Sequence, residues 1–141
     1  MKNLFHLFSI TMLIISCSKD NDTPTPTTTQ SELILGKWEH TTDKLVQGDG
    51  TVVEGPYGGN ASGCDKDYKT FSAGGYEAGD YINVGGICDL SVPNGTWSIT
   101  DNKIKLGSST FDIVILTETD FAYKINSGAS GSQTFFMKKV N

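Results

Sequence analysis

The sequence predicts an all-β domain that is a single antiparallel, up-and-down meander. Apolar residues alternate with polar ones at a period of two, turn-forming residues recur at short intervals, and no segment of the domain has a helical apolar stripe longer than two turns. A meander with one apolar face must pack on a second layer or close on itself, and closure removes exposed strand edges. We therefore expect a closed barrel of about eight strands, a size at which side chains fill the interior or one small ligand fits.

The clearest hairpin spans residues 96–106. "TWSIT" places Trp97 and Ile99 on one face, the Asp-Asn pair at residues 101–102 makes a compact turn, and "KIKL" places Ile104 and Leu106 inward.

Further strands follow the same alternation. "FDIVIL" (residues 111–116) and "FAYKI" (residues 121–125) each have an apolar residue at every second position, and "QTFFMKK" (residues 133–139) ends the domain. The residues expected inward in the first two are Phe111, Ile113, Ile115, Phe121, Tyr123 and Ile125. Earlier strands are expected at residues 36–42, 51–54, 68–72 and 76–82.

Residues 1–16 have the profile of a signal peptide, with one cation at Lys2 and a nearly all-apolar stretch from Leu4 to Ile15. As a helix this stretch would rise about 18 Å, which is short of a hydrocarbon layer of about 30 Å, so we expect its removal. Residues 14–17, Ile-Ile-Ser-Cys, resemble the bacterial lipobox. The resemblance implies that Cys17 is acylated, with palmitate among the expected chains, and becomes the mature N-terminus. An ordinary secretory peptide is the alternative.

Residues 17–31 are polar and rich in threonine and proline, which is typical of an extended tether. The domain is expected over residues 32–141, a common size for a single core. The acidic start of the tether resembles the short charged signal of lipoproteins displayed on the outer face. We therefore expect an outer-membrane lipoprotein of the cell envelope that faces the surface or the periplasm.

The three cysteines are compatible with one lipid anchor and one pair. If Cys17 carries lipid, Cys64 and Cys88 remain as an even pair in an oxidising compartment and predict a disulfide. Two free thiols or a metal pair are the alternatives, although further Cys or His ligands for a metal are lacking.

The charge of the chain argues against nucleic-acid binding. The formal net charge is −5, it becomes −6 once Lys2 is removed with residues 1–16, and the sequence contains no arginine. A basic footprint for phosphates is therefore missing, and acylation rather than charge would bring the protein to a membrane.

Two further patterns resemble the lipocalin-like (calycin-type) barrels. "ILGKWEH" resembles their Gly-x-Trp opening strand, in which the tryptophan plugs the closed end and a basic residue of the last strand lies across it; Lys138 or Lys139 is the available match. A bacterial lipocalin-like lipoprotein family is matched more closely by Cys64, Asp67, Phe71, Gly75 and Tyr76, and by "GTWSI", "KIKL" and "ILTETDFAYKI".

The resemblance implies a lipid-anchored protein that needs no cofactor and binds a small molecule, for which an apolar ligand is expected. The candidate ligand-binding residues are the inward-facing ones, and the alternative is that they only fill the barrel. They are Trp38, Phe71, Tyr76, Trp97, Phe111, Ile113, Tyr123 and Phe135.

A second hypothesis is an interaction module with a filled core. Residues 46–63 contain six glycines and Tyr57 and are expected to form a long mobile loop that binds a protein or a glycan. The identity of any protein partner is not predicted.

Enzyme chemistry has little support, and no catalytic or metal-binding residue is assigned. His40 is the sole histidine after residue 16 and lies on the face of Trp38, where a core or rim residue is the simpler interpretation. The acidic pairs Asp65/Asp67 and Asp20/Asp22 lack the glycine and distal glutamate of a calcium loop.

Overall fold

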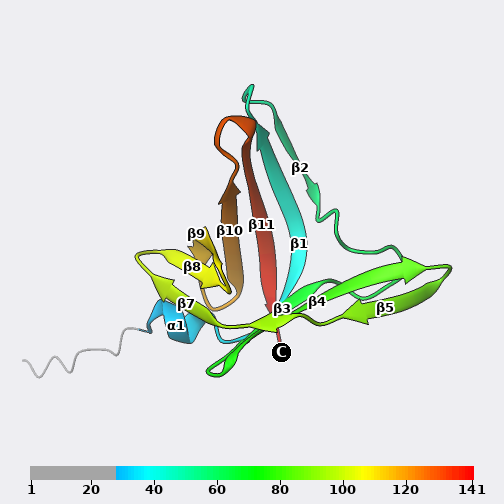
Figure 1. Ribbon diagram of the computed structural model, residues 1–141, viewed down its shortest axis with the longest axis horizontal. Helices are drawn as coiled ribbons and strands as arrows, with labels where there is room; N and C mark the ends of the chain where they lie inside the picture. Colours follow the sequence, from blue (N-terminus) through cyan, green and yellow to red (C-terminus); the bar gives the residue numbers. More distant parts are fainter. Residues whose placement is uncertain (1–27) are drawn as a thin grey trace, which may run out of the picture.

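The computed structural model describes residues 28–141, which fold almost entirely into antiparallel strands (Figure 1). The expected signal peptide, Cys17 and most of the tether lie outside these residues. The elements are α1 (Gln30–Leu33), β1 (Gly36–Gln47), β2 (Val52–Pro56), β3 (Tyr68–Ser72), β4 (Gly75–Val84), β5 (Ile87–Ser91), β6 (Asn94–Gly95), β7 (Trp97–Thr100), β8 (Lys103–Leu106), β9 (Ser109–Leu116), β10 (Asp120–Asn126), the 3-10 turn η1 (Gly128–Ser130) and β11 (Gly131–Val140).

The strands are ordered β5-β4-β3-β1-β11-β10-β9-β8-β7, with β2 on β1 and β6 on β4. The two ends of this ladder meet through β6 and β7, because β6 pairs with β4, β7 pairs with β8, and only Thr96 separates them. The indole N–H of Trp97 also donates to the carbonyl of Ser72 at 2.8 Å. The pairing therefore forms a ring, and the predicted all-β meander barrel is confirmed.

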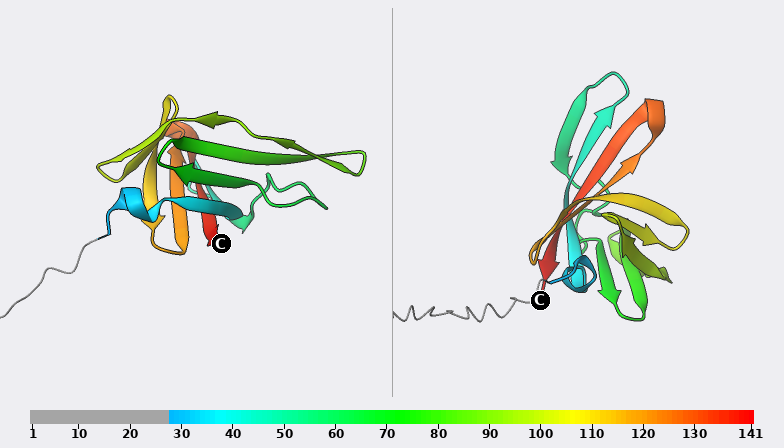
Figure 2. Two further views of the ribbon diagram at one scale, coloured as in Figure 1. Left: turned by 90° about the horizontal axis from the view of Figure 1, so that it is seen from below. Right: turned by 90° about the vertical axis from the view of Figure 1, so that its left-hand side faces the viewer.

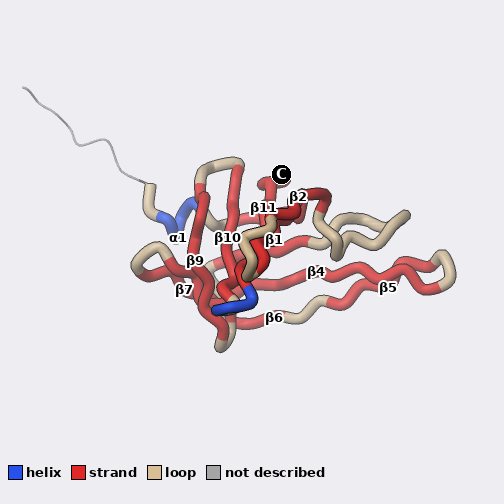
Figure 3. The backbone as a smooth tube through the Cα atoms, turned by 90° about the horizontal axis from the view of Figure 1, so that it is seen from above, coloured by secondary structure: helices blue, strands red, loops and turns tan. Residues whose placement is uncertain are grey.

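The number of positions around the ring is also the predicted eight. β2 and β3 follow one another along one edge of β1, and β5, β6 and β7 follow one another along β4 and then β8. The β4–β5 hairpin extends beyond the barrel as an arm, visible at the right of Figure 1 and in the left view of Figure 2. Figure 3 shows that β6 continues the line of β5 along the side of β4.

One end of the barrel is closed by α1 and Trp38. A capping box between Thr29 and Glu32 starts α1. The helix delivers Ile34, whose side chain is fully buried and whose carbonyl accepts a 2.6 Å hydrogen bond from the indole N–H of Trp38. The lysine that lies across this tryptophan is Lys139, with its Nζ 5.0 Å from the ring and 3.1 Å from the carbonyl of Leu33. Lys138 instead pairs with Asp120 on the outer surface.

Two β-bulges change the expected alternation. In β9 the register shifts opposite Ala122 and Tyr123, so Val114 is an extra residue and Ile115 turns outward, with 39% of its surface exposed. The prediction that Ile115 faces inward is therefore wrong, and Leu116 packs against the core in its place. In β1 the shift lies between His40 and Thr42 and turns Asp43 to the side of Phe135.

The glycine-rich stretch at residues 46–63 is not one long loop, because residues 46–47 and 52–56 belong to β1 and β2, so the prediction of a single loop is wrong. Its first part is the β1–β2 hairpin, with Gly50 at φ +86° in the turn. Residues 57–67, between β2 and β3, form an insertion that a disulfide joins to β5.

No helix among residues 28–141 is long and apolar enough to cross a membrane.

Candidate functional site

The inner face of the barrel has an apolar half at the α1 end, which we call the narrow half, and a more polar half at the other end, which we call the wide half. In the narrow half, Trp38 and Phe71 are almost fully buried, and both contact Phe121 edge to face at 5.7 and 6.1 Å between centroids. Phe71 also contacts Trp97 at 5.8 Å and Tyr76 at 6.2 Å. These aromatic rings pack against one another, so the narrow half is filled by the protein itself.

All eight predicted inward residues belong to this core or pack against it. Trp38, Phe71, Ile113 and Tyr123 are buried, and Tyr76, Trp97, Phe111 and Phe135 are partly buried beside them. Their inward orientation agrees with the structure, and a role in ligand binding stays a prediction.

The wide half carries what we call the inner polar cluster: His40, Asp43, Tyr57, Lys69 and Asp80. β1 supplies His40 and Asp43, and the 57–67 insertion supplies Tyr57. Lys69 comes from β3 and Asp80 from β4. Alternation along β4 puts Asp80 on the same side as the buried Ala78, and Asp80 itself is exposed at the rim.

His40 is the most deeply buried member, with 2% of its surface exposed. Its ring stacks on Tyr57 with centroids 4.2 Å apart and contacts Phe135 edge to face at 6.0 Å. Its Nδ1 has no hydrogen-bond partner within the described part of the chain. Burial, and secondarily the charge of Lys69, lowers the pKa of His40 to about 3, so the imidazole is neutral at physiological pH.

Tyr57 is held over His40 by backbone and side-chain contacts of the insertion. Its N–H donates to the carbonyl of Thr41 at 3.0 Å. The side chain of Asn60 then joins the insertion to β1 and to Asp67, donating to the carbonyl of His40 at 3.3 Å and accepting from the N–H of Asp67 at 2.9 Å.

Asp67 connects the insertion to two strands. Its carbonyl accepts from the N–H of His40 at 2.9 Å, and its carboxylate accepts from the N–H of Tyr81 in β4 at 2.7 Å. Only 4% of its surface is exposed, and burial raises the pKa of its carboxyl group. The disulfide between Cys64 and Cys88 secures the other end of the insertion. The predicted pairing of these cysteines is confirmed. Asp67 anchors the insertion to β1 and β4.

Lys69 projects into the barrel from β3. Its register partners are Trp38 and Ala78, both buried, and its Nζ lies 5.9 Å from the centroid of the Tyr123 ring. Within residues 28–141 this Nζ takes part in none of the ion pairs. Burial lowers the pKa of Lys69, and the negative charges of Asp80 and Asp67 oppose that effect.

An aromatic wall adjoins the inner polar cluster. Tyr123 stacks on Phe135 at 5.2 Å and contacts Phe111 at 5.4 Å, and Tyr57 contacts Phe135 at 5.9 Å. Burial raises the pKa of the Tyr123 phenol, so it stays protonated and able to donate a hydrogen bond. The wide half therefore combines flat apolar surfaces with one cation and several hydrogen-bonding groups.

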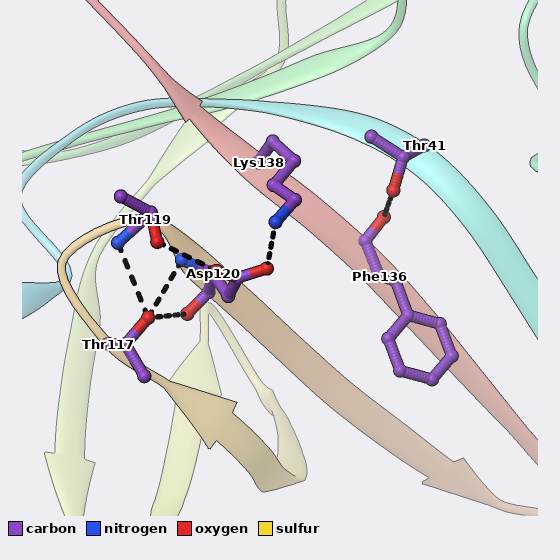
Figure 4. A network of polar contacts seen from close by, with 6 residues as sticks. All are labelled: Thr41, Thr117, Thr119, Asp120, Phe136 and Lys138. Carbon is purple, nitrogen blue, oxygen red and sulfur yellow. Dashed lines mark hydrogen bonds and ion pairs between the residues drawn. The ribbon is translucent and has the colours of Figure 1, made fainter.

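The outer surface also has hollows. One of about 530 Å³ lies over the β3–β4 turn and β6, between Thr70 and Thr96. Another, of about 190 Å³, lies over the two bulges, and Figure 4 shows Lys138 bound to Asp120 and the hydroxyl of Thr41 bound to the carbonyl of Phe136 at its rim. Both lie on the outer face, away from the inner polar cluster.

Comparison with known protein families assigns the chain to one of them. A model of the lipocalin-like domain matches residues 34–127, about two thirds of the sequence. The chain belongs to the lipocalin-like domain family. The match covers the strands from β1 to β10, and with them every member of the inner polar cluster. Neither the curated proteins nor the solved structures gave a match to this lipocalin-like domain.

Sequence reasoning identified the aromatic wall and missed most of the polar residues beside it. Lys69 had a usable signal, because it is two residues from the inward-facing Phe71 on the same strand. Asp43 had none, because its direction depends on a bulge that strict alternation does not predict. Within the described residues, no group of three or more potential ligands is placed to hold a metal ion.

Proposed function

We propose that this lipocalin-like protein binds a small, largely apolar ligand in the wide half of its barrel. Membership of the lipocalin-like family supports a binding role, and the filled narrow half restricts the available position. The main observation in support is that the imidazole of His40 is buried beside the aromatic wall and that its Nδ1 has no hydrogen-bond partner among the described residues. A buried polar atom without a partner costs free energy, and a bound molecule that supplied the missing hydrogen bond would recover it.

The aromatic wall suits a ligand with a flat apolar portion. The ring centroid of Phe135 lies 5.9 Å from that of Tyr57 and 5.2 Å from that of Tyr123. Stacking on such surfaces stabilises a ligand without demanding a particular polar group, and the inner polar cluster would then orient it.

Titration with the neutral fluorescent probe N-phenyl-1-naphthylamine tests this proposal. Phe135 and Phe136 are neighbours on β11 that point to opposite faces, since Phe135 packs on the core and Phe136 borders the outer hollow. We expect F135A to weaken probe binding at least tenfold and F136A to leave it within twofold. Equal effects of the two substitutions, or no saturable binding by the wild-type protein, would contradict the proposal.

We also propose that the protein acts at the cell envelope, held there by acylation of Cys17. The supporting features are the apolar segment before Cys17, the Ile-Ile-Ser-Cys sequence and the polar tether after it. Mass spectrometry of the mature N-terminus should find a lipid-modified cysteine, and C17A should remain unmodified. An unmodified Cys17, or a mature chain that begins elsewhere, would refute the anchor.

Binding without catalysis is part of the same proposal. The one histidine among the described residues is buried, has a strongly lowered pKa and stacks on an aromatic ring, so it is poorly suited to proton transfer at neutral pH.

A second candidate function rests on β5. Within the described chain this strand pairs only with β4, all five of its residues are exposed, and Ile87 is 72% exposed. An exposed edge strand with apolar side chains can accept an extended peptide as an added strand. The partner would therefore be an extended segment of another protein, and the recognition element would be the arm rather than the glycine-rich stretch.

Proline at position 90 tests this candidate. In a hairpin with the two-residue turn Gly85–Gly86, the N–H of Leu90 points to the free edge, so L90P removes an edge donor and keeps the pairing with β4. Capture of envelope proteins should fall with L90P and persist with L90A, while equal capture by both variants would exclude strand addition.

A further inference from the structure

Lys69 differs from the other lysines of the domain in where its amine lies. Lys37, Lys44, Lys103 and Lys138 each form an ion pair on the outer surface, and Lys139 is bonded at the closed end. Lys69 instead extends along the inner face, between Trp38 on one neighbouring strand and Ala78 on the other. Its amine therefore lies on the side of the sheet where the proposed function places the ligand.

The amine of Lys69 has an aromatic ring nearby and forms no ion pair in the described part of the chain. The opposite residue on β4 is alanine, so no large side chain stands across from it. The ring of Tyr123 is 5.9 Å away, and no ion pair involves the amine within residues 28–141. A partly buried amine beside an aromatic surface, with no carboxylate within ion-pair distance, can act as a nucleophile.

We infer that Lys69 is a covalent attachment point for aldehydes, held as a reversible imine inside the barrel. This inference rests on the proposed function, because the aldehyde must first enter the wide half as an apolar ligand. The neutral amine attacks the carbonyl carbon, a C–N bond forms, and the resulting carbinolamine loses its oxygen as water. Both amine hydrogens leave in that water, so one amine and one aldehyde give one imine and one water, with no oxidant or reductant.

Burial and the neighbouring charges change the pKa of Lys69 in opposite directions. Burial lowers the pKa of Lys69 and so increases the fraction of neutral, nucleophilic amine at neutral pH, and Asp80 and Asp67 limit that gain. His40 adds no charge there because its imidazole is neutral. The aromatic wall around Tyr123 and Phe135 would hold an aromatic or long-chain aldehyde beside the amine.

Reductive trapping tests the inference. The purified protein is incubated at pH 7 with a small excess of trans-cinnamaldehyde and sodium cyanoborohydride, which converts an imine to a stable secondary amine, and the labelled lysines are mapped by peptide mass spectrometry. Lys105 is the internal reference, because it is exposed on the outer face of β8 between two inward residues. We expect Lys69 to be labelled at least tenfold faster than Lys105. K69R should lose this rapid phase, and K105R should retain it.

Labelling of Lys69 no faster than that of Lys105 would overturn the inference. That comparison is made within one wild-type molecule, so it decides the matter even if K69R folds poorly. Cinnamyl alcohol, which has the same body without the carbonyl, separates the two proposals when it is tested for displacement of N-phenyl-1-naphthylamine. If the alcohol displaces the probe but Lys69 is not labelled, the covalent site is wrong and the binding function stands. If neither the probe nor the alcohol binds, both proposals fail.

Discussion

His40 and Tyr57 lie face to face, with ring centroids 4.2 Å apart and ring planes 20° from parallel. One residue belongs to β1 and the other to the insertion that follows β2, so the stack joins the wall of the barrel to a segment that the sequence predicts to be a loop. The stack buries the imidazole, and the burial gives the protein a measurable dependence of stability on pH.

The folded protein should lose stability as the pH falls from about 6.5 toward 3. The pKa of His40 is lowered from 6.5 in the unfolded chain to about 3 in the fold, so between these values the unfolded state binds more protons and acid favours unfolding. From pH 7 to pH 5 the contribution of His40 should fall by about 2 kcal/mol. H40F should remove this part of the slope in urea unfolding measured at both pH values. An identical slope for wild type and H40F would show that His40 is not held neutral.

Loss of the disulfide should destabilise the insertion and the arm. The bond between Cys64 and Cys88 closes a loop across a sequence separation of 24 residues, for which the expected loss is about 3 kcal/mol in the double C64A/C88A variant. Thermal unfolding followed by circular dichroism measures the change, and C17A serves as the control that removes a cysteine outside the pair. A melting temperature unchanged by C64A/C88A would be inconsistent with this role.

Phe121 should be among the costliest single positions in the core. It is 1% exposed and its ring contacts Trp38, Phe71 and Tyr123. F121A should lower the free energy of unfolding by about 3 to 5 kcal/mol in guanidinium titrations, because it leaves a cavity that rigid neighbours cannot fill. V114A, at the 49% exposed bulge of β9, should change it by less than about 0.5 kcal/mol. Comparable losses in the two variants would argue against the described core.

The turn between β7 and β8 should tolerate glycine better than alanine. Asp101 and Asn102 have φ values of +50° and +60°, and the Asn102 side chain donates to the carbonyl of Ile113 at 2.8 Å. N102A and N102G both lose that hydrogen bond, but only alanine is strained at positive φ, so N102A should be less stable than N102G by about 1 kcal/mol. The reverse order in chemical unfolding would mean that the turn has a different backbone conformation.

Sequence alone predicted most of the strands and most of the core, because alternation in "KIKL" and "FAYKI" corresponds to faces that are buried in the fold. It failed where local geometry departs from strict alternation, at the bulges that turn Ile115 outward and Asp43 inward. It also missed β5, since Ile87–Ser91 contains a cysteine, an aspartate and a serine and is exposed throughout. That strand follows a two-residue glycine turn and is joined to the insertion by the disulfide, and neither constraint has a periodic signal.

The residues of the candidate site also divide into those that alternation predicts and those that it does not. Phe111, Tyr123 and Phe135 were predictable because apolar periodicity marks them, whereas the inner polar cluster depends on long-range contacts. Tyr57 reaches His40 only because Asn60 and Asp67 fold the insertion back onto β1. Such contacts join residues far apart in sequence, and no local pattern encodes them.

The most direct test of the central claim, that a ligand occupies the wide half of the barrel, is an NMR titration of the protein with N-phenyl-1-naphthylamine. The binding proposal predicts the largest chemical-shift changes at the side chains of His40, Tyr57, Tyr123 and Phe135, with little change at Thr70 and Asn94 beside the outer hollow. Changes concentrated at Thr70 and Asn94, with the four inner rings unaffected, would place the ligand outside the barrel and contradict the claim.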